Sequence, residues 1–145
     1  MTSGIDILVV DDDLELERLI QRFLTLQGYD VETVSSPLVA MERVRQKKFH
    51  IAIIDIVMPE MDGLELLQRL HGYDPLLQII VITGYGTLPR AVTALENGAT
   101  DFLLKPFEGM DELGEAIRLC EEKIRRWHLR LRNVVALKKV QRTVS

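Results

Sequence analysis

The chain has 145 residues, of which 47% are hydrophobic and 28% charged; this composition predicts one globular domain with a buried core and excludes an intrinsically disordered chain. Its single cysteine, Cys120, excludes an internal disulfide, and we interpret it as a small apolar packing residue. The first residues lack the basic segment of a signal peptide, and no apolar run approaches the ~20 residues that span a bilayer, so we expect a cytoplasmic protein without membrane contact.

Five short strand-like runs predict β-strands, and segments with helical spacing of apolar residues separate them. The runs are Ile5–Val10, Val31–Val34, Phe49–Asp55, Gln78–Thr83 and Asp101–Leu104. Five alternations of strand and helix are typical of a parallel sheet with helices on both faces. The sequence therefore predicts an α/β fold built on a doubly wound parallel sheet.

The start and stop signals of the helices agree with their apolar spacing. The first helix places Leu16, Leu19, Ile20 and Phe23 on one stripe and ends near Gly28. The second opens with Ser36 as a cap and Pro37 at the first helical position. We expect the third helix from about Gly63 to Leu70, the fourth from about Thr87 to Asn97, and the fifth from near Glu108.

The fifth helix is predicted to continue beyond the end of a five-unit domain. Its apolar residues follow alternating steps of four and three, as in a coiled-coil heptad, and Lys138 stands where the next one is due. They are Leu113, Ile117, Cys120, Ile124, Trp127, Leu131 and Val134. A helix from near 110 to near 140 would be ~45 Å long, so its second half would project and pair its apolar stripe with another helix. The alternative is a partly ordered linker after the first half.

Charge divides the chain in the same place. Residues 1–122 hold all 22 acids against 10 Lys and Arg, a net charge of −12, whereas residues 123–145 hold 8 Lys and Arg and no acid. We interpret this basic segment as a solvated helix face, with contact to an acidic partner as the alternative. No base-reading element is visible, so direct nucleic-acid contact is not expected. We therefore separate a domain at residues 4–122 from a basic helical extension or linker at 123–145.

Polar residues follow the apolar runs of four predicted strands. Asp11 and Asp12 follow the first strand, Asp55 ends the third, Thr83 ends the fourth, and Lys105 follows the fifth. Because the carboxyl ends of parallel strands share one edge of the sheet, these side chains should converge. Carboxylates that close together need a cation between them, and Mg²⁺ prefers such oxygen ligands. The set predicts a magnesium site that can receive a phosphoryl group.

Taken singly, most of these residues have a plainer interpretation. Asp12 with Glu15 three residues later has the spacing of a capping box, and on its own the cap is favoured. Thr83 alone is ordinary turn chemistry. Lys105 precedes Pro106, and an X–Pro bond can be cis and direct the preceding side chain inward. Asp55 lacks an evident structural role, and the ordered combination favours a functional site.

Over residues 4–122 the chain resembles the receiver domains of two-component response regulators. The matching segments are Ile7-Leu8-Val9-Val10-Asp11-Asp12-Asp13, Asp55-Ile56-Val57-Met58-Pro59-Glu60-Met61-Asp62-Gly63, Thr83-Gly84 and Asp101-Phe102-Leu103-Leu104-Lys105-Pro106-Phe107. The resemblance implies a flavodoxin-like (βα)5 fold with strand order 2-1-3-4-5. It also implies a signalling domain that assists its own phosphorylation and dephosphorylation, rather than an enzyme.

The resemblance assigns a role to each site residue. Asp55 would be the phosphoacceptor, which receives its phosphoryl group from a sensor histidine kinase or a phosphotransfer protein. Asp11, Asp12 and Asp55 would hold Mg²⁺, with Asp12 a more direct ligand than Asp11, and the main-chain carbonyl of Val57 would complete the set. Thr83 and Lys105 would contact the phosphoryl group.

The resemblance also implies a switch. Movement of Thr83 toward the phosphoryl group would open space for the ring of Phe102, which lacks a hydroxyl and can signal only by burial. The surface of the fourth helix, fifth strand and fifth helix would then change and control an output domain or a partner. A homodimer would form through this surface or through the C-terminal helix.

Further segments resemble the receivers of transcriptional regulators of the nitrogen-control type. They are Thr83-Gly84-Tyr85-Gly86, Ala91-Val92 and Gly98-Ala99-Thr100-Asp101-Phe102. The printed sequence contains no Gly-x-x-x-x-Gly-Lys-Ser/Thr loop, so we expect an N-terminal piece of a longer regulator, or alternatively a stand-alone receiver. Two other classes are alternatives. One is a degenerate receiver that only binds proteins. The other is an Asp-nucleophile phosphohydrolase, which is disfavoured because Val57 occupies the place of the second acid of that class.

Overall fold

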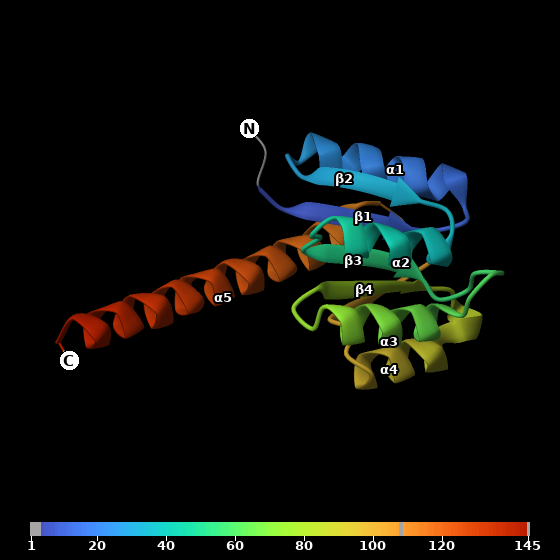
Figure 1. Cartoon of the computed structure of the whole chain (residues 1–145). Coiled ribbons are helices and arrows are strands. Elements are labelled where there is room, and N and C mark those ends of the chain that lie inside the picture. Colours follow the sequence, from blue (N-terminus) through green and yellow to red (C-terminus); the bar gives the residue numbers. More distant parts are fainter. Residues whose placement is uncertain (1–3, 108, 145) are drawn as a thin grey trace.

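Strands and helices alternate along the chain in the computed structural model (Figure 1). It describes residues 4–107 and 109–144, and for residue 85 and residues 139–144 the backbone alone. The elements are β1 (Asp6–Val10), α1 (Leu14–Leu26), β2 (Asp30–Val34), α2 (Pro37–Gln46), β3 (Ile51–Asp55), α3 (Gly63–Tyr73), β4 (Gln78–Thr83), the 3-10 turn η1 (Tyr85–Thr87), α4 (Leu88–Glu96), β5 (Asp101–Leu104) and α5 (Asp111–Val144). The predicted start of the fifth helix near Glu108 lies outside the described residues.

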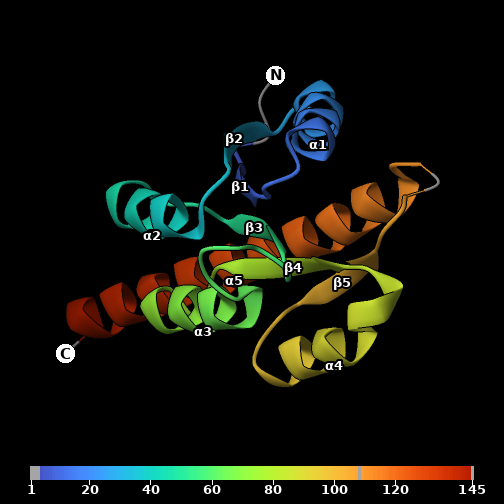
Figure 2. The ribbon, with the colours of Figure 1, turned by 90° about the vertical axis from the view of Figure 1, so that its right-hand side faces the viewer.

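The five strands form one parallel sheet in the order β2-β1-β3-β4-β5, which confirms the predicted topology. Helices α1 and α5 cover one face of the sheet, and α2, α3 and α4 cover the other (Figure 2). Because every strand runs in the same direction, all five carboxyl ends lie at one edge. The connections after β1 and β3 depart to opposite faces, which opens a crevice at that edge.

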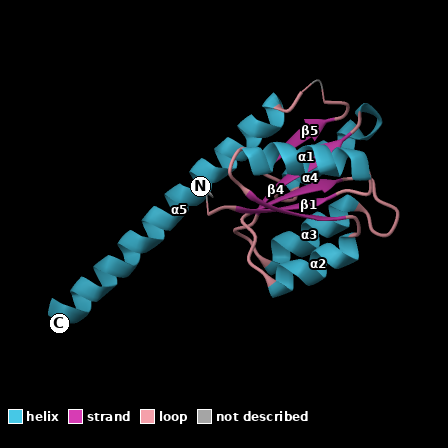
Figure 3. Ribbon diagram, turned by 90° about the horizontal axis from the view of Figure 1, so that it is seen from above, coloured by secondary structure: helices cyan, strands magenta, loops and turns pink. Residues whose placement is uncertain are grey.

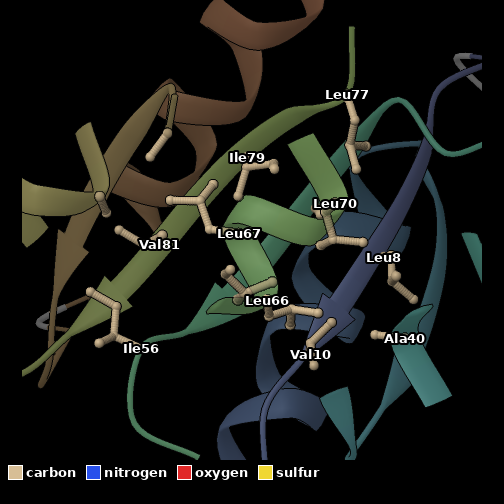
Figure 4. Close-up of a cluster of buried hydrophobic side chains, with 14 of the residues drawn as sticks. Leu8, Val10, Ala40, Ile56, Leu66, Leu67, Leu70, Leu77, Ile79 and Val81 are labelled. Carbon is tan, nitrogen blue, oxygen red and sulfur yellow. The ribbon is translucent and has the colours of Figure 1, made fainter. Parts of the chain in front are cut away.

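Each face of the sheet has its own core. Figure 4 shows the core under α2, α3 and α4, where Leu8 and Val10 of β1 meet Leu66 and Leu70 of α3. On the other face, Ile7, Val9, Ile20, Leu24, Ile117 and Cys120 pack together. Cys120 is buried with its thiol free, which confirms its interpretation as a packing residue. The central strands are apolar on both faces because both faces are covered.

Helix α1 is capped by Asp13, whose carboxylate accepts the backbone N–H groups of Glu15 and Leu16. The capping interpretation of Asp12 taken alone is therefore not supported. The buried residues of α1 are Glu17, Ile20 and Leu24, whereas Leu19 is exposed. Leu16, Ile20 and Phe23 pack on the core under α1 as predicted, so Leu19 is the residue of the predicted stripe that faces solvent instead. In α2, Ser36 caps the helix and Pro37 opens it, as predicted.

Glu17 is a buried acid that should make stability depend on pH. Burial raises the pKa of its carboxyl, a hydrogen bond with Thr33 partly offsets this, and Oε2 has no hydrogen-bond partner within the described residues. The folded state therefore holds the proton more tightly than the unfolded state, so this contribution to stability falls as the pH rises above about 4.5. We expect Glu17→Gln to raise the melting temperature at pH 7 but not at pH 4, with the exposed Glu15→Gln as control. A gain equal at both pH values would contradict this reading.

Helix α5 is one continuous element from Asp111 to Val144, which confirms the predicted long C-terminal helix. Figures 1 and 3 show its second half projecting beyond the sheet, on the side away from the strand arrowheads. Among the described helices, none combines the length and apolarity needed to cross a lipid bilayer.

Candidate functional site

Acidic and basic side chains meet at the carboxyl edge of the sheet. Asp11 follows β1, Asp55 is the last residue of β3, and Lys105 follows β5. Asp11 and Asp55 are buried, and Lys105 lies half-buried beside them. The parallel topology brings them together, because β1 and β3 are hydrogen-bonded neighbours and Lys105 follows β5 at the same edge of the sheet. The predicted convergence of these three residues is therefore observed.

Lys105 is shared by the two buried carboxylates. Its Nζ lies 2.9 Å from Oδ2 of Asp55 and 3.5 Å from Oδ2 of Asp11. Burial acts to lower the pKa of Lys105, but its hydrogen bond with Asp55 and the charges of both acids outweigh burial and raise the pKa. The ammonium therefore stays charged and partly compensates two negative groups.

Backbone amides fix the other oxygen of each acid. Oδ1 of Asp55 accepts the N–H of Val57 at 3.0 Å, and Oδ1 of Asp11 accepts the N–H of Asp13 at 2.9 Å. These bonds leave Oδ2 of each carboxylate directed to the same region as Lys105. The Val57 side chain is 53% exposed, so this residue contributes to the site through its backbone.

The three acids have the chemistry of a divalent-cation site. Asp11, Asp12 and Asp55 each offer an oxygen within 4.8 Å of the other two. Oδ2 of Asp11 is buried and, within the described part of the chain, has no hydrogen-bond partner. Burial raises the pKa of Asp11 to about 6; Asp55 adds to the shift, while the Asp13 amide and Lys105 oppose it. An all-oxygen set with an unsatisfied buried oxygen fits a hard ion such as Mg²⁺.

Thr83 lies at the same edge, but its hydroxyl is engaged elsewhere. The hydroxyl donates to the Gly84 carbonyl at 3.2 Å and makes a short hydrogen bond with the hydroxyl of Thr87. Its backbone carbonyl accepts the N–H of Lys105 at 2.8 Å, which ties the end of β4 to the residue after β5. The Thr83 side chain thus lies at the same sheet edge as the acidic cluster, but its hydroxyl is bonded to Gly84 and Thr87.

Phe102, the predicted switch residue, lies on β5 facing α4. Its ring is partly buried and packs against the core shared with Ala91 and Ala94 of α4. The ring is therefore placed between the sheet and the helix that follows Thr83.

Gly63 is part of the site's support, and spacing alone did not reveal it. It is the first residue of α3, and its N–H donates to the carbonyl of Ile56 at 2.9 Å. A Cβ at this position would lie 2.5 Å from the Asp55 carbonyl oxygen and 2.5 Å from Ile56 Cα. Only glycine lets α3 approach the backbone of Asp55 this closely. Asp62, which caps α3 and pairs with Arg90 of α4, is a second residue that the sequence reasoning missed.

Comparisons with known proteins agree with this architecture. A family model described as "response regulator receiver domain" matches residues 7–118. Over 104 residues the chain is 40% identical to the transcriptional regulatory protein ZraR of Klebsiella oxytoca, and over 125 residues 38% identical to the C4-dicarboxylate transport transcriptional regulatory protein DctD of Rhizobium meliloti. These alignments cover 72% and 86% of this chain but only 24% and 27% of those proteins. The chain thus spans about a quarter of the length of these curated relatives.

Two solved structures show the same fold. A response regulator receiver domain protein from Clostridium thermocellum superposes with a TM-score of 0.78 at 27% identity, covering 85% of this chain and 98% of that one. NtrX from Brucella abortus superposes with a TM-score of 0.79 at 30% identity, covering 90% of this chain and 30% of that one.

Proposed function

The chain belongs to the response regulator receiver domain family of two-component signal transduction, and on this premise we propose that Asp55 is its phosphoacceptor. The observation that carries the proposal is the geometry around Asp55: a buried carboxylate with Oδ1 fixed by a backbone amide and Oδ2 paired with Lys105. Such a group is held in one orientation and faces a cluster that can compensate added negative charge.

The reaction follows from these positions. A carboxylate oxygen of Asp55 attacks the phosphorus of a phosphohistidine on the partner kinase or phosphotransfer protein, forming an O–P bond as the P–N bond breaks. The released imidazole keeps the electron pair of that bond and takes a proton. Lys105 stabilises charge on the transferred oxygens, and Thr83 does so after its hydroxyl leaves Thr87. The same groups would assist hydrolysis, in which water attacks the phosphorus and the O–P bond to Asp55 breaks, releasing inorganic phosphate and restoring the carboxylate. The domain would therefore promote both its own phosphorylation and its dephosphorylation.

The proposed cofactor is Mg²⁺, held by Asp11, Asp12, Asp55 and the backbone carbonyl of Val57. When bound, it would supply positive charge to the phosphoryl oxygens. The fit is supported by the three clustered carboxylates and by the buried Oδ2 of Asp11, which has no hydrogen bond within the described residues and only a 3.5 Å ion pair with Lys105.

Loss of one carboxylate should weaken metal binding. We expect Asp12→Asn to lower the affinity for Mg²⁺ about 10-fold or more, because a charged ligand becomes a neutral one. Asp13→Asn is the matched control: it changes the adjacent carboxylate, lies outside the three-acid cluster, and keeps a good cap for α1. The affinities follow from calorimetric titration with MgCl₂. Equal loss in both variants would contradict the assignment of Asp12.

The proposed output is a change in the α4–β5–α5 surface. Thr83 precedes α4 and Phe102 lies under it, so withdrawal of the Thr83 hydroxyl from Thr87 would alter the start of α4 and free space for the ring. This surface exposes Val92 and Leu119, which suits association with an output domain or a second copy.

We further propose that residues 4–122 form the receiver and residues 123–145 a helical extension. The extension exposes Leu131 and Val134, which supports pairing of two extensions as an alternative homodimer contact.

ZraR and DctD are named as transcriptional regulators, so the process controlled is proposed to be transcription, in the cytoplasm, through an output domain outside the printed sequence. Sizing with and without beryllofluoride tests the switch: a change of size that Asp55→Ala abolishes is expected, and no change would contradict a phosphorylation-dependent dimer.

A further inference from the structure

The first turns of the α5 extension are held against the domain rather than free. The buried stripe of α5 ends at Ile124, and beyond it Trp127, His128 and Leu131 line a small cavity of about 110 Å³. The opposite walls of this cavity are residues 48–50, which lead into β3, and Leu76, which precedes β4. The contact lies at the amino-terminal edge of the sheet, at the end opposite Asp55 (Figure 1).

Ring contacts join the two sides of this cavity. The rings of His50 and His128 meet edge to face, with centroids 6.3 Å apart and planes at 71°. His50 is itself fixed, because its Nδ1 accepts the backbone N–H of Asp6 at 3.0 Å. On the helix, the ammonium of Lys123 lies 5.5 Å from the centre of the Trp127 ring. A chain of contacts therefore runs from β1 through His50 to α5.

A second attachment lies about two turns earlier on the helix. The hydroxyl of Tyr29, in the segment before β2, donates to Oε2 of Glu121 at 2.7 Å. Oε1 of Glu121 also accepts from Arg125 at 2.7 Å. Burial, together with the bond to Glu121, raises the pKa of Tyr29 to about 12, so the hydroxyl remains a donor at neutral pH. Two attachments close together constrain the direction of a helix more than one does.

Farther along, the described side chains of α5 are exposed: Val134, Val135 and Leu137 are 48–64% accessible. A long helix curves only gently unless it contains a specific kink, so its direction is set where it leaves the domain. Trp127 supplies the largest side chain at that point and belongs to the cavity wall.

We propose that Trp127, which lines this cavity together with residues 48–50 and Leu76, is the positioning residue of a joint that fixes the direction of the α5 extension relative to the sheet. The purpose of the joint rests on the proposed function: movement of the first half of α5 on phosphorylation would pass to the extension only if the joint is stiff.

Distances between two spin labels test the joint directly. The labels are placed at Arg45→Cys on α2 and Ala136→Cys on α5, both exposed positions. Cys120 can remain, because burial raises its pKa to about 12 and its thiol reacts slowly. Labelled protein is diluted with unlabelled protein, so that each distance is measured within one chain. The parent should give one narrow distance distribution.

The expected effect is loss of direction without loss of fold. We expect Trp127→Ala to widen the distance distribution at least about twofold. Trp127→Phe, which keeps an aromatic ring, should give a width close to that of the parent. Leu76→Ala removes a cavity-lining side chain on the domain side and should also widen the distance distribution, although the helix sequence is unchanged. Leu129→Ala makes the same leucine-to-alanine truncation at an exposed helix position outside the cavity, so it is the matched control.

Two results would overturn the proposal. One is an unchanged distance distribution in both Trp127→Ala and Leu76→Ala, and the other is an equal widening in Leu129→Ala. Circular dichroism and the melting temperature show that each variant is folded. The measurement uses unphosphorylated protein, so a chain that takes no phosphoryl group but keeps the narrow distribution would retain the joint and lose only the proposed function.

Discussion

Replacing Lys105 by methionine is expected to slow phosphorylation of Asp55 by acetyl phosphate about 100-fold or more, because one preorganised charge on the transferred oxygens is lost. The reason lies in the geometry: Nζ of Lys105 is 2.9 Å from Asp55 and 3.5 Å from Asp11. Lys105→Arg keeps the charge on a larger group and should be impaired much less. The rate is followed as the gain of one phosphoryl mass over time.

The same substitution should also change the metal-free protein. Without Lys105, the buried carboxylates of Asp11 and Asp55 lose the cation that partly compensates them. We expect Lys105→Met to be less stable than the parent at pH 7 in EDTA, and to regain stability on addition of Mg²⁺. A variant phosphorylated at the parent rate would show that Lys105 has no part in the transfer.

Gly63→Ala is expected to have the largest effect on stability of any single methyl addition in α3. The new Cβ would lie 2.5 Å from the Asp55 carbonyl oxygen and 2.5 Å from Ile56 Cα, and backbone atoms cannot turn aside as a side chain does. We expect a loss of about 2 kcal/mol or more, together with slower phosphorylation, because the displaced backbone carries Asp55. Denaturant unfolding and the mass assay measure the two effects.

Gly72→Ala is the matched control on the same helix. A Cβ at Gly72 meets no atom within 4 Å, and alanine is the better helix former, so this variant should gain about 0.5–1 kcal/mol. If Gly63→Ala gained stability as Gly72→Ala does, this result would contradict the close packing of α3 against the backbone of Asp55.

Much of the fold was predictable because the signals were local. The strand-like runs became strands with bounds within about two residues, and the signal was strongest for the central strands, which are apolar throughout because both faces are covered. The order of the polar residues at the strand ends predicted the site, because parallel strands share one carboxyl edge. The long α5 also followed from its heptad spacing.

What the sequence did not predict depends on contacts between distant residues. The N-cap of α1, Asp13, is a local feature, but the run of three acids from Asp11 to Asp13 does not show which of them caps the helix. The burial of Glu17 and the exposure of Leu19 depend on the rotation of α1 against the sheet. The close approach at Gly63 and the cavity around Trp127 join segments far apart in the chain, so no local pattern reveals them.

The hydroxyl of Thr83 is a further case. Its position at the end of β4 was predicted, but its hydrogen bond with Thr87 depends on the geometry of the turn into α4. This bond gives the proposed switch a defined starting state, in which the hydroxyl is occupied and the ring of Phe102 is only partly buried.

The most direct test of the account is the intact mass of the chain after incubation with acetyl phosphate and Mg²⁺, beside Asp55→Ala and a sample containing EDTA. We predict a gain of one phosphoryl mass in the parent, and none in the variant or in the chelated sample. No gain in the parent, with the fold intact and Mg²⁺ bound, or an equal gain in Asp55→Ala, would contradict the assignment of Asp55 as phosphoacceptor.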